Sequence, residues 1–190
     1  MKLVFASHNP NKIIEIKTLL PQNFEILSLD DIGCHDEIPE TADTIEGNAI
    51  LKANFVATHY GLDCFADDSG LEVDELNGEP GVFSARYAGN QKNSHDNIKK
   101  LLEQMQGKSN RKANFKTVIA LNLNGENFLF TGIVDGKITL EPRGSLGFGY
   151  DPVFELEGFS YTFAEIPAAK KAKISHRARA VEQLVAFLKN

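Results

Sequence analysis

The sequence is poor in the features that mark secreted, membrane-bound and zinc-binding proteins. Its two cysteines, Cys34 and Cys64, have no CxxC pairing and no third partner for a zinc site, so we expect reduced thiols. The longest apolar run covers only residues 184–188, and residues 1–12 lack the apolar length and cleavage site of a signal peptide. These absences predict a soluble, cytoplasmic chain with no membrane partner.

The charge pattern argues against a nucleic-acid polymer as partner. The formal net charge is −6, whereas proteins that bind nucleic acid broadly are usually basic. Residues 170–179 nevertheless hold five of the 20 Lys and Arg residues and none of the 26 Asp and Glu residues. This basic island indicates a local anion such as a phosphate chain, although a solvated start of a helix would show the same composition.

Common nucleotide and nucleophile motifs are missing. The P-loop pattern is absent, and no GxGxxG opens a helix, because Gly144, Gly147 and Gly149 lie late in the chain between predicted strands. Ser69 lacks the GxSxG surroundings of a nucleophilic serine. Water activated by a carboxylate and Mg²⁺ therefore fits hydrolytic chemistry better than a side-chain nucleophile.

The chain begins with a predicted strand, turn and helix. Residues 2–6 form a short apolar run of the kind found in strands that are buried on both faces. Ser7 or Asn9 can cap the following helix, Pro10 suits its first position, and Pro21 ends it.

A second strand and helix follow. Residues 24–29 are predicted to be extended, and Asp43 with Glu46 forms a candidate capping box. The helix after this box runs to Tyr60 and is closed by Gly61.

The middle of the chain reads as a strand, a helix and a hairpin. Residues 64–70 are predicted to be a buried strand with its exit turn at Ser69 and Gly70, and a helix capped by Ser94 follows. Asn124-Gly125 between two apolar runs is a strong hairpin signal.

The last predicted element is a helix with Ser175 as candidate cap. Together these elements predict an α/β fold with a mixed, elongated, curved sheet flanked by helices. We expect residues 1–190 to form a single domain whose two lobes enclose an active-site cleft.

The first turn is a candidate phosphate site. A helix that starts at Asn9, Pro10, Asn11 and Lys12 offers free backbone N–H groups and the positive end of its dipole. Lys12 adds a full charge one turn into the helix. An ordinary capped helix would have the same sequence, so the motif alone leaves both interpretations open.

Three acids adjoin the candidate turns, namely Glu40, Asp67 and Asp68. If Asp67 and Asp68 pointed into one cleft about 4 Å apart, their repulsion would be about 4 kcal/mol at an effective dielectric of roughly 20. Mg²⁺ binds through one or two carboxylates plus phosphate oxygens and would relieve this repulsion. Because side chains alternate along a strand, one acid can face the metal while the other orients a lysine or a backbone N–H. An acidic turn capped by Ser69 is the structural alternative.

An aromatic loop follows the hairpin. Phe148 and Tyr150 flank Gly149, which lets the backbone approach a flat ligand. Stacking of an exposed aromatic ring on a base is worth about 1–3 kcal/mol. A phenylalanine in a glycine loop is also often a plug in the core.

Six blocks of the sequence resemble, in order and spacing, the inosine triphosphate pyrophosphatase family. The blocks are SHNPNK, ETADTIEGNAILKA, ADDSGLEVD, GVFSARYAG, GFGYDPVF and ISHRARA, and they cover nearly the whole chain. The resemblance implies a Mg²⁺-dependent homodimer that cleaves the non-standard purine nucleotides ITP, dITP and XTP to the monophosphate and pyrophosphate, which cleanses the nucleotide pool.

The resemblance also implies the role of each site residue. Asp68 would be the general base and a metal ligand, and Glu40 the second metal ligand. The substrate would bind to the triphosphate residues Ser7, His8, Asn9, Pro10, Asn11, Lys12, Lys52 and Ser69, and to the base-side residues Phe148, Gly149, Tyr150, Asp151, Lys171, His176 and Arg177.

Two departures from the family pattern surround Glu40. Ala42 stands where the family often has Gly, and Gly47 stands where an acid is common. The family pattern therefore does not determine the local geometry around Glu40.

Base selectivity is explained by a hypothesis. Hypoxanthine and xanthine carry a 6-oxo acceptor where adenine carries an amino donor, so donors from residues 149–151, His176 or Arg177 would reject ATP. GTP shares the 6-oxo group, and the sequence does not indicate how it is rejected.

Two other functions compete with this interpretation. A non-catalytic nucleotide-binding module of the same fold would bind without cutting, but it would gain little from Glu40, Asp67 and Asp68 beside a triphosphate. A septum-inhibitor-type nucleotide pyrophosphatase would share the first turn but would lack GFGYDP and SHR.

Overall fold

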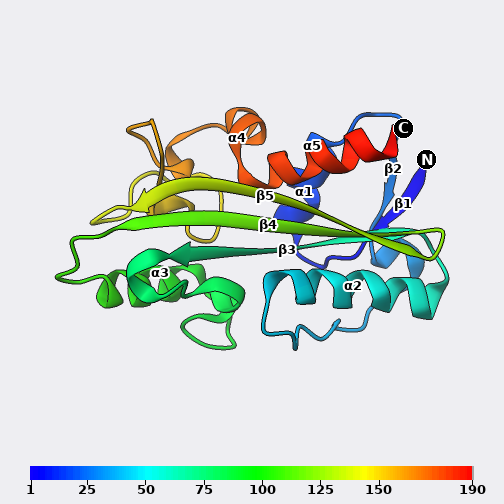
Figure 1. Ribbon diagram of the computed structural model, residues 1–190, viewed down its shortest axis with the longest axis horizontal. Coiled ribbons are helices and arrows are strands. Elements are labelled where there is room, and N and C mark those ends of the chain that lie inside the picture. The colour runs from blue at the N-terminus through cyan, green and yellow to red at the C-terminus, as the bar shows by residue number, and fades with distance from the viewer. Residues whose placement is uncertain (190) are drawn as a thin grey trace. The chain divides into compact units, whose positions relative to one another are not determined.

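The computed structural model describes residues 1–189. The strands are β1 (Lys2–Phe5), β2 (Glu25–Leu27), β3 (Cys64–Val73), β4 (Lys112–Leu123), β5 (Glu126–Ile138) and β6 (Phe154–Leu156). The α-helices are α1 (Pro10–Leu19), α2 (Ile45–Tyr60), α3 (Ser94–Gln104), α4 (Ala168–Ile174) and α5 (His176–Leu188), as Figure 1 shows. Short 3₁₀ turns lie at Asp30–Ile32, Asp74–Leu76, Gly81–Arg86, Asp151–Val153 and Phe163–Glu165. No helix in the described part of the chain combines the length and the apolar character needed to cross a membrane.

The strands form one sheet in the order β2-β1-β3-β4-β5-β6. β1 pairs in parallel with β2 and β3, so that Val4 lies opposite Leu27 on one side and Cys64 on the other. β5 and β6 are antiparallel, with Ile138 opposite Phe154. The prediction of an α/β fold with a mixed sheet flanked by helices is confirmed.

The chain divides into two compact units, each built from separate segments. The first unit contains Met1–Asp68, Thr117–Gly132 and the segment from Arg177 onward, and the second contains Ser69–Lys116 and Ile133–His176. β3, β4 and β5 each contribute residues to both units.

Helices cover both faces of the strands in the first unit. α1 and α5 lie on one face and α2 lies on the other (Figure 1). On the α1 and α5 face, Phe65 of β3 packs in one apolar cluster with Ile16 and Leu184. Its neighbour Cys64 points the other way, and its Sγ donates to the carbonyl of Ala53 on α2 at 3.1 Å. The alternation of side chains along β3 therefore sorts its residues between the two helical layers.

The second unit has its own core. Ile98 and Leu101 of α3, and Met105 directly after this helix, pack with residues of all the strands of this unit in one buried cluster. Phe154 is fully buried in this cluster, with its ring centroid 4.6 Å from that of Phe115.

Two signals that depend on adjacent residues are confirmed by the structure. Asn9 is the N-cap of α1 and Pro10 is the first helical residue. Asn124 and Gly125, with φ of 52° and 82°, join β4 to β5 as the hairpin signal predicts.

Three local predictions were wrong in position. Thr44 rather than Asp43 caps α2, because its Oγ1 accepts from Gly47 N at 3.0 Å. Asn93 rather than Ser94 caps α3. β3 does not turn at Ser69 and Gly70 but continues to Val73, so the DDSG segment lies inside a strand. Pairing within the sheet overrides the weak strand propensity of glycine here.

Candidate active site

Asp67 and Asp68 face opposite sides of β3. Asp67 Oδ1 lies 3.1 Å from Lys12 Nζ, and Asp67 Oδ2 lies 2.9 Å from Arg177 Nη2. Asp68 Oδ1 instead accepts from Lys52 Nζ at 3.0 Å. Lys12 and Arg177 belong to α1 and α5, whereas Lys52 belongs to α2 on the other face. The two carboxylates therefore point in different directions, and each has its own cationic partner.

Asp67 is the centre of a buried ion network. Its side chain is fully buried, and Arg177, which is 1% exposed, also donates its Nε to Asp67 Oδ2 at 3.0 Å. The same guanidinium pairs with Glu15. Burial alone would raise the pKa of Asp67, but Lys12 and Arg177 hold it well below its usual value.

The ion network engages the guanidinium of Arg177. We predicted a contact with substrate, whereas the structure places the guanidinium in the interior, bound to Asp67 and Glu15. Glu15 was not among the predicted site residues. Its position three residues after Lys12, on the same face of a predicted helix, was the available signal.

Lys52 joins the other two predicted site acids. Its Nζ lies 2.6 Å from Glu40 Oε1 and 3.0 Å from Asp68 Oδ1. The Glu40 side chain is 27% exposed, whereas those of Lys52 and Asp68 are nearly buried. Burial raises the pKa of Asp68, and Lys52 only partly offsets this effect. Burial would lower the pKa of Lys52, but Asp68 and Glu40 raise it.

The first helical turn does not offer free amides. Asn9 Oδ1 accepts from the backbone N–H groups of Asn11 at 3.0 Å and Lys12 at 3.3 Å. The prediction of free N–H groups here was wrong, because the cap already uses them and Pro10 has none. Asn9 N in turn donates to Ser7 Oγ at 3.2 Å. An anion at this turn would have to compete with the cap or bind to side chains.

Side chains for an anion are present at the same turn. His8 is exposed, with a ring nitrogen 3.1 Å from the carbonyl of Asp36. The Lys12 ammonium is mostly buried, and this burial lowers its pKa, which Asp67 partly restores.

Glu40 and Asp68 have oxygen donors of the kind that bind a divalent cation. Both carboxylates converge on one cationic group, Lys52 Nζ, and each has a second oxygen. Within residues 1–189 no group of three or more acidic, histidine or cysteine side chains could hold a metal alone. A site with two protein carboxylates suits Mg²⁺, which takes its other ligands from water and phosphate.

The second unit holds the predicted base-side residues. Asp151 Oδ2 accepts from Phe148 N at 2.8 Å and from Lys171 Nζ at 2.6 Å. The same ammonium lies 4.8 Å from the centroid of the Phe148 ring. Asp151 and Lys171 are both buried, and their contacts fix the position of the loop that carries Phe148.

Two further predicted base contacts lie in the interior of this unit. Tyr150 is 4% exposed and its hydroxyl donates to the carbonyl of Ser84 at 2.9 Å. Burial raises the pKa of Tyr150 above its usual value. His176 is also 4% exposed and stacks on Phe115 with ring centroids 4.6 Å apart. Phe148 and Gly149 remain half-buried.

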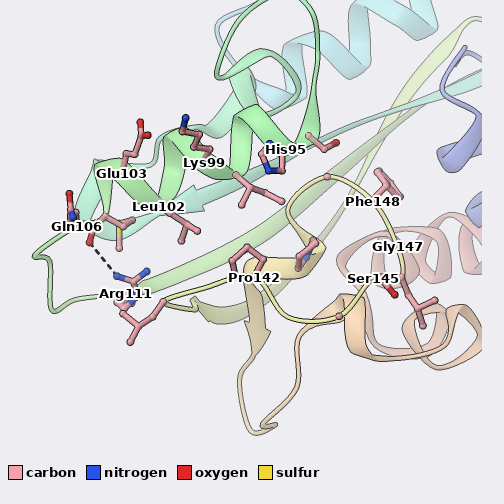
Figure 2. A pocket seen from close by; sticks show the side chains of 18 of the residues that line it. His95, Lys99, Leu102, Glu103, Gln106, Arg111, Pro142, Ser145, Gly147 and Phe148 are labelled. Atoms are coloured by element: carbon pink, nitrogen blue, oxygen red, sulfur yellow. Dashed lines mark hydrogen bonds between the residues drawn. The ribbon is translucent and has the colours of Figure 1, made fainter.

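A cavity of about 1140 Å³ lies within the second unit. Figure 2 shows it between α3 and the loop that runs from Leu140 to Pro152. Phe148 and Gly149 belong to its wall, together with Leu102 of α3. This cavity lies beside the aromatic loop, and all of its lining residues belong to the second unit.

Comparison with known proteins gives consistent matches over the full chain. The Ham1 family matches residues 3–187. A dITP/XTP pyrophosphatase of Flavobacterium psychrophilum is 62% identical over 190 residues, which is 100% of both chains. One of Bacillus subtilis is 46% identical over 97% of this chain and 96% of the relative. The structure of the Staphylococcus aureus Ham1 protein superposes with a TM-score of 0.91 at 39% identity, covering 100% of this chain and 98% of that one.

Proposed function

The chain belongs to the Ham1 family, and we propose that it hydrolyses dITP, ITP and XTP to the monophosphate and pyrophosphate. The observation that carries this proposal is the 62% identity, over the full length of both chains, to a dITP/XTP pyrophosphatase. An enzyme of this kind is a hydrolase of phosphoric anhydrides. The recognition of the family and of the enzyme class from sequence is confirmed by these relatives.

We assign the triphosphate to the first turn and Lys52, and the base to the aromatic loop. Lys12 and Lys52 supply the positive charge for the phosphates, with Ser7 and His8 at the same turn as Lys12. Asn9, Pro10 and Asn11 shape this turn, and Ser69 follows Asp68 on β3. We propose that residues 1–190 act as one functional domain, because three strands continue from one unit into the other.

Mg²⁺ is the cofactor we propose, held by Glu40 and Asp68. The donor set supports it, since two carboxylates beside a phosphate chain are typical of this ion. When bound, the ion neutralises phosphate charge and polarises the reacting phosphoryl group.

Asp68 is the proposed general base. It accepts a proton from the water that attacks the α-phosphorus, while the bond from that phosphorus to the bridging oxygen breaks. Burial raises the pKa of Asp68, which makes it a stronger base than an exposed aspartate. Lys52 fixes the carboxylate at 3.0 Å and, with Lys12, stabilises the charge on the leaving pyrophosphate. Arg177 acts on this site through Asp67, which holds Lys12.

Base selectivity is proposed to come from backbone donors of the aromatic loop. No hydrogen bond from the amides of Gly149 and Tyr150 is found within residues 1–189. A 6-oxo group could accept from them, whereas the amino group of adenine could not. A site built on such a hydrogen bond can reject the mismatched analogue by about 10⁴-fold. Phe148 supplies the stacking surface, and Asp151 and Lys171 hold it in place.

Release of pyrophosphate from ITP tests the function directly. Wild-type protein with Mg²⁺ is expected to yield IMP and pyrophosphate, and Asp68→Asn is expected to lose at least about 100-fold in kcat, as for removal of a general base. Asp74→Asn, at an exposed aspartate, is the matched control and is expected to stay at wild-type rate. Binding of ITP without cleavage would instead identify a nucleotide-binding module.

The assembly and location remain predictions of the resemblance. We propose a cytoplasmic homodimer with a nucleotide substrate and no nucleic-acid or membrane partner. Light scattering of the purified chain at several concentrations measures the oligomeric state.

A further inference from the structure

The segment that precedes α2 is fixed to the first turn of this helix by two polar contacts. Thr44 Oγ1 accepts from Gly47 N at 3.0 Å. Asn48 Oδ1 accepts from Ala42 N, also at 3.0 Å. Asn48 is 1% exposed, so its contact with Ala42 is shielded from water. The backbone at residue 42 therefore has a fixed position relative to the helix.

The lack of a side chain at Gly47 leaves room for this arrangement. A Cβ atom placed on Gly47 would lie 2.6 Å from the Cβ of Ala42 and 3.0 Å from Thr44 Oγ1. Side chains at both positions 42 and 47 cannot coexist without a shift of the backbone. The two departures noted in the sequence thus offset each other, because Ala42 fills the space that a side chain at residue 47 would need.

The same segment carries Glu40. Glu40 lies two residues before Ala42, and Lys52 lies one helical turn after Asn48. Glu40 Oε1 and Lys52 Nζ are 2.6 Å apart. The Asn48–Ala42 hydrogen bond therefore joins the segment that carries Glu40 to the helix that carries Lys52.

We propose that Asn48 is a positioning residue for Glu40, and that the lack of a side chain at Gly47, beside Ala42, sets the spacing at which it acts. Its effect on catalysis rests on the proposed function and on Glu40 as a ligand of the divalent cation. The effect of Asn48 on the position of this segment depends only on the contacts described above. Within residues 1–189 the Asn48 Nδ2 atom has no hydrogen-bond partner, so this side chain serves through its oxygen.

The first experiment replaces Asn48 with Leu, which has a similar size and no acceptor. Amide hydrogen exchange at Ala42, followed by NMR without metal or nucleotide, is expected to accelerate about five-fold or more, as for the loss of one hydrogen bond. Asn48→Asp keeps an acceptor oxygen and is expected to retain most of the protection. Unchanged exchange at Ala42 in Asn48→Leu would overturn the proposal.

The second readout is the Mg²⁺ concentration that gives half-maximal ITP hydrolysis. Asn48→Leu is expected to raise it about ten-fold or more, as for other residues that orient metal ligands, with kcat at saturating Mg²⁺ close to wild type. In a Glu40→Gln background the same substitution should produce no further change. An equal shift in both backgrounds would show that Asn48 does not act through Glu40.

The spacing is tested by exchanging the two small residues. Gly47→Ala alone is expected to lower the melting temperature and to accelerate exchange at Ala42, whereas Ala42→Gly combined with Gly47→Ala should recover most of both. A double variant as damaged as the sum of its single changes would refute the spacing argument. If wild-type protein releases no pyrophosphate, the proposed function fails, while amide exchange and melting temperature still decide this inference.

Discussion

Removal of the charge on Asp67 is the sharpest test of the buried ion network. Asp67→Asn keeps the size and one acceptor oxygen but leaves Lys12 and Arg177 without their shared carboxylate, whose oxygens lie 3.1 Å from Lys12 Nζ and 2.9 Å from Arg177 Nη2. Asp67 is fully buried and Arg177 is 1% exposed, so water cannot replace the lost partner.

The expected loss of stability is large. Removal of one partner from a buried ion pair typically costs about 3–5 kcal/mol. For a chain of this size each kcal/mol lowers the melting temperature by about 2–4 °C, so the variant should melt about 6–20 °C below wild type. Arg177 keeps Glu15 as a second partner, which places the expectation in the lower half of this range.

Urea unfolding followed by circular dichroism measures the difference. Glu25→Gln is the contrasting control, because Glu25 pairs with Lys2 at 3.3 Å but both side chains are more than half exposed. That surface pair should contribute less than about 1 kcal/mol. If Asp67→Asn lost no more stability than Glu25→Gln, the argument that Asp67 anchors α1 and α5 to β3 would be refuted.

Three further predictions concern single side chains. Tyr87 donates to Glu79 Oε2 at 3.1 Å, and burial raises its pKa to about 12. Because the unfolded pKa is about 10, the stability that this hydroxyl contributes is complete below pH 10 and is lost as pH rises toward 12. The corresponding fall in the free energy of unfolding should be absent in Tyr87→Phe. Phe148→Ala should raise KM for ITP about ten-fold through lost stacking, with little change in melting temperature; an unchanged KM would exclude a stacking role. Burial raises the pKa of Cys64 to about 12, so mass spectrometry should find it unlabelled by iodoacetamide at pH 8 until urea unfolds the chain.

Local features were predictable because a few adjacent residues determine them. The cap at Asn9 and the turn at Asn124-Gly125 need only the conformational preferences of those residues. The predicted position of the α2 cap was wrong by one residue, because Asp43 and Thr44 are both good caps and only the backbone geometry decides between them.

Contacts between distant residues limited the prediction of the site. Asp67 and Arg177 are 110 positions apart, and no local pattern links them. The alternation of side chains along β3 did indicate that one of the two aspartates could orient a lysine. It could not show that Arg177 would be buried beside Asp67 rather than exposed to substrate.

We propose that Glu40 and Asp68 direct hydrolysis at the α-phosphorus of a 6-oxopurine triphosphate. A panel of ITP, dITP, XTP, GTP and ATP, assayed with and without Mg²⁺ and resolved by product, tests it most directly. We expect monophosphate and pyrophosphate from the three non-standard nucleotides, dependence on Mg²⁺, and turnover of ATP that is lower by about 10⁴-fold. Release of a diphosphate and inorganic phosphate, or equal turnover of ATP and ITP, would contradict the account.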